Sequence, residues 1–150
     1  MALEDDIARL KLLPMLAELE SDALRLLAFS AEMKILRQGD VLFSRGDASD
    51  CAFVVIAGSF ELCASDDRAQ RRIVGANAML GEIALLTATN RPATAVAREP
   101  STVLKLPRTL FHRVLQEFPR SARRLHDVMT KRVIDFAGEL RALNLDPQDR

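Results

Sequence analysis

The chain is poor in the side chains that catalysis and metal binding require. Its 150 residues include only two histidines, His112 and His126, and two cysteines, Cys51 and Cys63. Both histidines fall in segments with a helical pattern, where histidine is more often packed or solvated than catalytic. The cysteines are too few and too widely spaced for a metal knuckle, so we expect reduced, packed thiols. We therefore expect no catalytic residues, no metal site and no cofactor.

Tryptophan, tyrosine and long apolar runs are absent as well. Any stacking on a base must therefore use Phe or Arg. Lys plus Arg equals Asp plus Glu at 21 each, which gives no reason to expect nucleic acid or an anionic membrane as a partner. No apolar run approaches the ~20 residues of a membrane span, and the acidic N-terminus MALEDDIARL lacks the pattern of a signal peptide. These absences predict a cytoplasmic protein.

The middle of the chain has the pattern of an all-β unit. The chain is 49% apolar, which is enough to build one domain with a core. Between residues 33 and 106, short apolar runs alternate with turns that contain Gly, Asp and Ser. Such a series of short strands is typical of a sandwich or a jelly-roll barrel. The predicted strands cover 33–36, 41–43, 52–56, 60–64, 71–74, 94–97 and 102–106.

Helical patterns precede and follow this unit. Residues 4–29 predict two short helices, broken at Pro14, with the second starting at Ser21. Residues 108–118 predict another helix, and Pro119 can open the next one. The segment 121–143 is amphipathic, with an apolar stripe formed by Leu125, Met129, Val133, Phe136, Leu140 and Leu143. The predicted fold class is α+β: one domain over 1–150, with helices in 1–32, a jelly-roll-like β-roll in 33–107 and C-terminal helices in 108–145.

Residues 80–95, LGEIALLTATNRPATA, combine groups that suit a phosphorylated sugar. Gly81 lets the backbone approach a ligand closely, and the Glu82 carboxylate can accept two hydrogen bonds from a diol. Residues 83–86 can form one helical turn, whose free N–H groups attract an anion. Arg91 supplies a planar fork for phosphate oxygens. This stretch, which we call the cassette, predicts a nucleotide clamp without a catalyst.

The cassette resembles the phosphate-binding cassette of cyclic-nucleotide-binding domains, which include Crp/Fnr-type sensor domains, protein kinase A regulatory subunits and channel domains. In that family, Gly-Glu, a small-apolar run and a variable loop precede Arg, small residues and Thr. The residues in register here are Gly81, Glu82, Ala84, Leu85, Arg91, Ala93 and Thr94. The resemblance implies that Glu82 holds the ribose 2′-hydroxyl, and that Arg91 and the Ala84 amide hold the cyclic phosphate. It implies a ligand site formed by Gly81, Glu82, Ile83, Ala84, Arg91, Pro92, Ala93 and Thr94, with Phe136 from the last helix.

One cassette position departs from the family pattern. The residue after the arginine normally offers its N–H to the phosphate, but Pro92 has none. A hydrogen bond to a charged group contributes about 1.5–3 kcal/mol. Its loss would weaken binding by roughly tenfold to a hundredfold, unless the proline stiffens the loop and recovers part of that. The sequence leaves both outcomes open.

The resemblance extends over nearly the whole chain. The segment 39–62 is similar to the front of the family's β-roll, with Gly39, Gly46 and Gly58 at its turns. In catabolite-activator-type transcription factors, a helix like 121–143 forms a dimer and leads into a helix-turn-helix. No recognition helix follows here, so we expect a helix-to-helix homodimer without DNA binding. Phe136 stands where that type carries a hydroxyl that reads the base, and it can instead stack on a purine.

Three functions follow, in order of preference. The first is a regulatory module that binds cyclic AMP or cyclic GMP, with cyclic AMP slightly ahead, and signals to a separate, unidentified protein partner. The second is a ligand-free dimerising or partner-binding scaffold of the same fold, which Pro92 supports. The third is a small enzyme. It is disfavoured because the chain has no Walker loop or dinucleotide fingerprint, and its strands lack the histidines of a metal-binding jelly roll.

Overall fold

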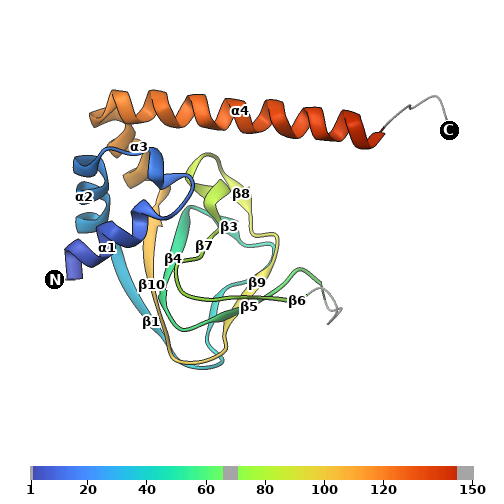
Figure 1. Ribbon diagram of the computed structural model, residues 1–150. Coiled ribbons are helices and arrows are strands. Elements are labelled where there is room, and N and C mark those ends of the chain that lie inside the picture. The colour runs from blue at the N-terminus through green and yellow to red at the C-terminus, as the bar shows by residue number, and fades with distance from the viewer. Residues whose placement is uncertain (1, 66–70, 145–150) are drawn as a thin grey trace.

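The molecule consists of a β-roll with helices gathered at one end and a long final helix (Figure 1). The computed structural model describes the backbone of residues 2–65 and 71–144, and the side chains of residues 3–65 and 71–131. The α+β fold class predicted from the sequence is confirmed. Among the described residues, no helix has both the length and the apolar character needed to span a membrane.

Three helical elements precede the β-roll. They are α1 (Ala2–Lys11), the single-turn 3₁₀ helix η1 (Leu16–Glu18) and α2 (Ser21–Ser30). Pro14 lies in the break between α1 and η1, as predicted, because a proline cannot continue an α-helix. Ser21 is the first residue of α2 rather than its cap. Glu20 occupies the cap position, and its N–H donates to Ser121 Oγ at 2.9 Å.

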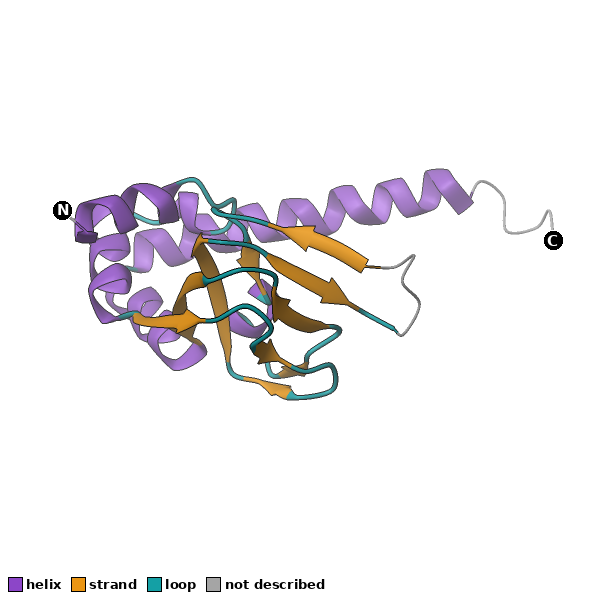
Figure 2. Ribbon diagram, turned by 90° about the horizontal axis from the view of Figure 1, so that it is seen from below, coloured by secondary structure: helices purple, strands orange, loops and turns teal. Residues whose placement is uncertain are grey.

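The β-roll contains two four-stranded antiparallel sheets and a small two-stranded one (Figure 2). The first sheet has the order β1-β10-β4-β7, the second β2-β9-β5-β6, and the third pairs β3 with β8. The strands are β1 (Glu32–Leu36), β2 (Val41–Phe43), β3 (Ala48–Ser49), β4 (Cys51–Ala57), β5 (Phe60–Cys63), β6 (Arg71–Val74), β7 (Met79–Leu80), β8 (Thr89–Asn90), β9 (Thr94–Ala97) and β10 (Ser101–Pro107).

Strand β4 explains why the molecule has two cores. Its sequence is apolar without alternation, which is typical of a strand buried on both faces. Ala52 and Val54 face the core under the helices, whereas Phe53 and Val55 face the core inside the β-roll. The first sheet therefore separates a helical core from the interior of the roll, and the cavity described below lies on the interior side.

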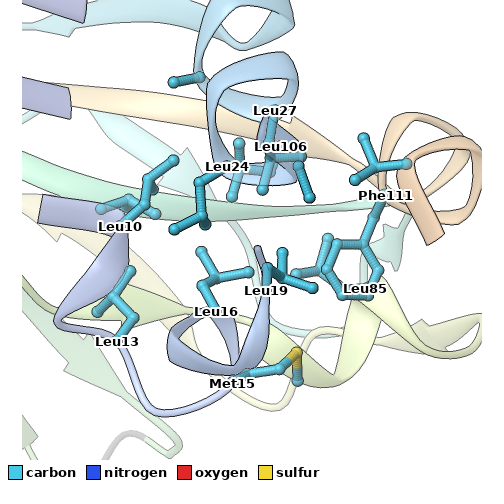
Figure 3. Close-up of a cluster of buried hydrophobic side chains, with 14 of the residues drawn as sticks. Leu10, Leu13, Met15, Leu16, Leu19, Leu24, Leu27, Leu85, Leu106 and Phe111 are labelled. Atoms are coloured by element: carbon cyan, nitrogen blue, oxygen red, sulfur yellow. The ribbon is translucent and has the colours of Figure 1, made fainter. Parts of the chain in front are cut away.

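The helical core joins the N-terminal helices to the cassette (Figure 3). Leu10, Leu16 and Leu24 are fully buried in it. Leu85, from the cassette turn η3 (Glu82–Leu85), and Phe111, from α3 (Arg108–Glu117), are fully buried in the same cluster. The cassette turn thus packs against helices that precede the roll in the sequence and against α3, which follows it.

The last helix, α4 (Pro119–Asn144), starts on this core and then leaves it. Pro119 is its first residue, where the missing N–H costs no helical hydrogen bond. Ser121 is fully buried and donates to Glu20 Oε2 at 3.0 Å, and Leu125 is also buried. Figure 1 shows the C-terminal half of α4 running past the α1–α3 group. The side chains of Val133, Phe136, Leu140 and Leu143, predicted to continue the apolar stripe, lie outside the described residues.

Candidate functional site

A cavity of about 350 Å³ opens between the second sheet and the cassette. This volume lies at the lower end of the range of small-molecule sites, roughly 300–1,000 Å³. Its wall is mainly apolar, and the charged residues that line it within the described part of the chain are two arginines. The lining residues are Phe43, Leu62, Ala64, Arg72, Met79, Leu80, Gly81, Arg91, Pro92 and Ala93. Four of the predicted ligand residues, Gly81, Arg91, Pro92 and Ala93, are therefore brought together in one wall.

Arg91 is held rigidly although it carries a charge. Its side chain is only 5% exposed. The guanidinium carbon lies 4.4 Å from the ring centre of Phe43 and 5.6 Å from that of Phe53, so the cation packs against two aromatic faces. Nη2 donates to the Cys51 carbonyl oxygen at 2.7 Å. The backbone is fixed too, since Arg91 N donates to the Asp47 carbonyl and its own carbonyl accepts from Gly46 N.

The other terminal nitrogen of Arg91 is buried without a partner. Among the described residues, Nη1 is the one buried side-chain nitrogen or oxygen without a hydrogen bond. Leaving a buried polar group unsatisfied costs about 1–3 kcal/mol, and more when the group is charged. A donor of this kind in a cavity wall is matched by an anionic acceptor, and none of the described residues that line this cavity carries a carboxylate.

Gly81 makes room for that nitrogen. Its φ of +74° lies in the left-handed region, which glycine adopts without strain. A Cβ on Gly81 would lie 2.1 Å from Arg91 Nη1, closer than any real contact. The absence of a side chain at residue 81 therefore lets the guanidinium reach its position.

The other predicted ligand residues do not line the cavity. Glu82 and Ile83 are exposed at the start of η3. Ala84 N donates to the Gly81 carbonyl at 3.0 Å, so this amide has a partner inside the turn. Thr94 Oγ1 accepts from Arg45 N at 2.9 Å. The Phe136 side chain lies outside the described residues. The roles of these residues toward a ligand stay predictions.

Comparison with known proteins identifies this arrangement. The family model of the cyclic nucleotide-binding domain matches residues 33–118, more than half of the chain. The chain belongs to the cyclic nucleotide-binding domain family. A solved structure from Brucella abortus, described as a cyclic nucleotide-binding-like protein, is 37% identical with a TM-score of 0.68, and the match covers 75% of this chain and 98% of that one.

Two further relatives show the range of proteins that carry this domain. The N-terminal domain of a transcriptional regulator from Streptomyces coelicolor is 25% identical with a TM-score of 0.80, over 88% of this chain and 94% of that one. The lysophospholipase NTE1 of Chaetomium globosum is 30% identical over 124 residues, which cover 79% of this chain. The match spans only 8% of that protein, so the likeness concerns its cyclic nucleotide-binding region.

Three residues of this cyclic nucleotide-binding domain that shape the site escaped prediction. Phe43 and Phe53 fall in predicted strands, but no sequence signal shows that their rings meet a single arginine from the cassette. Alternation along 71–74 could have placed Arg72 on the same face as Val74, which packs in the roll interior. The sequence does not reveal the register of β5 and β6, which the structure shows to place Arg72 opposite Leu62.

The cassette turn is tied to the C-terminal helices by a fourth residue, Arg108. This first residue of α3 donates from Nη1 to the carbonyl oxygens of Ser49 and Ala84 at 3.0 Å each, and to that of Thr87 at 3.2 Å. Its N–H also donates to the Asp50 carbonyl at 2.7 Å. One side chain thus satisfies carbonyls at the end of η3 that the short turn leaves free.

Cys51 lies beside Arg91 as a buried thiol. Its Sγ is 3.4 Å from Arg91 Nη2, and its side chain is buried. Burial raises the pKa of the thiol, and the nearby Arg91 charge only partly opposes that effect. The prediction of packed thiols is confirmed for Cys51, while Cys63 is half-buried and also free.

Proposed function

We propose that the cavity binds a 3′,5′-cyclic nucleotide and that the domain is a regulatory module rather than an enzyme. The observation that carries this proposal is Arg91 Nη1, a charged donor that is buried, unpartnered and set in a cavity wall. A cyclic phosphate brings one negative charge and two free oxygens, which match such a donor. Membership of the cyclic nucleotide-binding domain family supports the choice of ligand.

The remaining wall suits the nucleoside. Leu62 and Met79 offer apolar surface for a base. Glu82 is the acceptor for the ribose 2′-hydroxyl, as the family resemblance implies. It follows Gly81 directly, and no hydrogen bond holds its carboxylate within the described part of the chain. In this proposal the exposed Glu82 side chain turns toward the cavity when the sugar binds.

The output of the module is a movement of α4 that reaches a protein partner. Leu85 and Arg108 link the cassette to the core on which α4 begins. The sequence of α4 continues with apolar residues at steps of three and four beyond that core, which suits a second copy of the helix in a symmetric dimer. A ligand that contacts one arrangement of these elements better than the other shifts their populations.

The proposal is tested by thermal unfolding with a panel of ligands. A ligand present at 100 times its Kd stabilises the folded state by about 2.7 kcal/mol. This corresponds to a rise in Tm of roughly 5–10 °C for a domain of this size. We expect cyclic AMP or cyclic GMP to raise Tm, and the open 5′-monophosphates, whose phosphate is larger and dianionic, to have little effect. Unchanged Tm with both cyclic nucleotides at millimolar concentration would refute ligand binding.

A second candidate function is a ligand-free dimerising scaffold. Two observations favour it: Pro92 offers no N–H, and the Ala84 amide already donates to Gly81 within the turn. Both reduce the number of donors available to a phosphate. A scaffold would show no response to any cyclic nucleotide while remaining dimeric, so the same panel combined with light scattering separates the two functions.

A further inference from the structure

Strand β7 forms part of the cavity wall, but little sheet structure holds it in place. Its two residues, Met79 and Leu80, line the cavity and lead directly into Gly81. The strand lies at an edge of the first sheet and pairs with β4, with Leu80 opposite Phe53 and Met79 opposite Val54. Because a two-residue edge strand makes few ladder hydrogen bonds, its position depends on the contacts at its two ends.

An arginine from α1 holds the turn that leads into β7. Arg9 Nη1 donates to the Ile56 carbonyl oxygen at 3.1 Å, near the end of β4, and to Asn77 Oδ1 at 3.4 Å. Asn77 N itself donates to the Val55 carbonyl oxygen at 2.8 Å. Leu10, next to Arg9, is fully buried in the helical core, so the backbone that carries Arg9 is anchored (Figure 3). One side chain thus links α1 to the cavity wall.

The backbone of Asn77 makes this turn dependent on its contacts. Its φ is +71°, and among the described residues it is the one residue other than glycine with a positive φ. Asparagine adopts this left-handed conformation more readily than most residues, but it still costs free energy that the surroundings must offset. The hydrogen bond from Arg9 is one of the contacts that hold the turn. A shift of the turn would move Met79, two residues further along the chain.

We propose that Arg9 is a positioning residue for the cavity, through which docking of α1 and binding of a cyclic nucleotide strengthen one another. This inference rests on the proposed function of the same cavity. A docked α1 holds the turn and keeps β7 in place for the ligand, and a ligand that contacts β7 holds the turn for α1. Such coupling is reciprocal by thermodynamic necessity. A protein that displaces α1 therefore lowers the affinity of the cavity.

Calorimetric titration of the full chain, with the cyclic nucleotide that the wild type binds best, tests this role. We expect Arg9→Met to bind about fivefold more weakly, at the lower end of the coupling between distinct sites. Arg9→Lys keeps a charged donor and should recover part of the affinity. Arg25→Met is the matched control, because Arg25 pairs with Glu4 at 2.8 Å and so ties α1 to α2 rather than to the turn. It should bind as tightly as the wild type.

A gain-of-function variant tests the same contact without removing the arginine. Asn77→Asp places a charged acceptor opposite Arg9, and aspartate also adopts the left-handed conformation. We expect it to tighten binding by about twofold to threefold, the range of an exposed ion pair. The gain should vanish in the Arg9→Met background, as a double-mutant cycle requires. A gain that persists without Arg9 would overturn the proposal.

Amide hydrogen exchange separates coupling from a purely structural role of Arg9. In the wild type, the cyclic nucleotide should slow exchange both in β7 and in α1, whereas in Arg9→Met it should slow exchange in β7 alone. Equal protection of α1 by the ligand in both proteins, unchanged affinity in Arg9→Met, or an equal loss in Arg25→Met would overturn the role of Arg9 and leave cyclic-nucleotide binding intact. Absence of binding of cyclic AMP and cyclic GMP to the wild type would instead overturn the proposed function, and the inference with it.

Discussion

At the scale of single residues, the site depends on the fit between Gly81 and Arg91. Replacing Gly81 by Ala forces a left-handed backbone on a residue with a Cβ and places that Cβ against Nη1. We expect Gly81→Ala to lose about 1–2 kcal/mol of unfolding free energy from the backbone alone. Because Arg91 cannot keep its position, cyclic-nucleotide affinity should also fall more than tenfold.

Gly46→Ala provides the control for this prediction. Gly46 has a φ of +91°, but a Cβ there meets nothing within 4 Å. Urea unfolding should show the backbone loss in both variants and a further loss in Gly81→Ala, where Arg91 is displaced. Calorimetry should show weakened binding only in Gly81→Ala. Equal affinities of the two variants would mean that the Arg91 position does not govern binding.

Pro92 provides a second prediction at this scale. It is exposed, lines the cavity and follows the arginine, but it cannot donate a hydrogen bond. If the missing N–H limits affinity, Pro92→Ser should tighten cyclic-nucleotide binding by about tenfold. Pro100→Ser, at an exposed proline between β9 and β10, should leave the affinity unchanged. Equal or weaker binding by Pro92→Ser would show that another donor, such as the Ala93 amide, already serves the phosphate.

At the scale of elements, strands of three or more residues could be predicted from the sequence, and strands of two residues could not. The strands over 41–43, 71–74 and 94–97 have the predicted bounds, because apolar periodicity and turn residues mark both ends. The strands β3, β7 and β8 contain two residues each and were missed, because two residues carry no period. The cassette was located from its residues, but the contact of Arg91 with Phe43 and Phe53 depends on strands distant in sequence.

The link between the cassette and α3 leads to a prediction about Arg108. Replacing Arg108 by Met leaves the carbonyls of Ser49, Ala84 and Thr87 to water and removes a charge-assisted donor from each. We expect Arg108→Met to lower the unfolding free energy by about 2 kcal/mol, and to speed amide hydrogen exchange in the cassette turn. Arg113→Met, on the exposed face of the same helix, should change the unfolding free energy by less than about 0.5 kcal/mol. Unchanged exchange in Arg108→Met would show that packing of Leu85 holds the turn without it.

At the scale of the whole molecule, the length of α4 leads to the prediction of a dimer. The helix has 26 residues, or about 39 Å. Among the described side chains of α4, Met129 is the last one that packs against the helical core. We expect light scattering to find a homodimer at micromolar concentration, and Phe136→Glu combined with Leu140→Glu to shift it to a monomer. Lys131→Glu adds negative charge to an exposed position of the same helix and should leave the dimer intact. A monomeric wild type would refute the dimer, and a dimeric double variant would place the interface elsewhere.

The most direct test of the cyclic-nucleotide site separates the charge of Arg91 from its volume. Arg91→Met keeps an apolar stem near Phe43 and Phe53 and removes the buried charge with its unpartnered Nη1, at the cost of the hydrogen bond to the Cys51 carbonyl. Because these effects oppose one another, we expect an unfolding free energy within about 1 kcal/mol of the wild type. Calorimetric titration uses the cyclic nucleotide that the wild type binds best. The affinity should fall at least tenfold in Arg91→Met. It should be unchanged in Arg98→Met, which makes the same substitution at an exposed arginine outside the cavity. A folded Arg91→Met variant that binds as tightly as the wild type would contradict the assignment of this cavity as a cyclic-phosphate site.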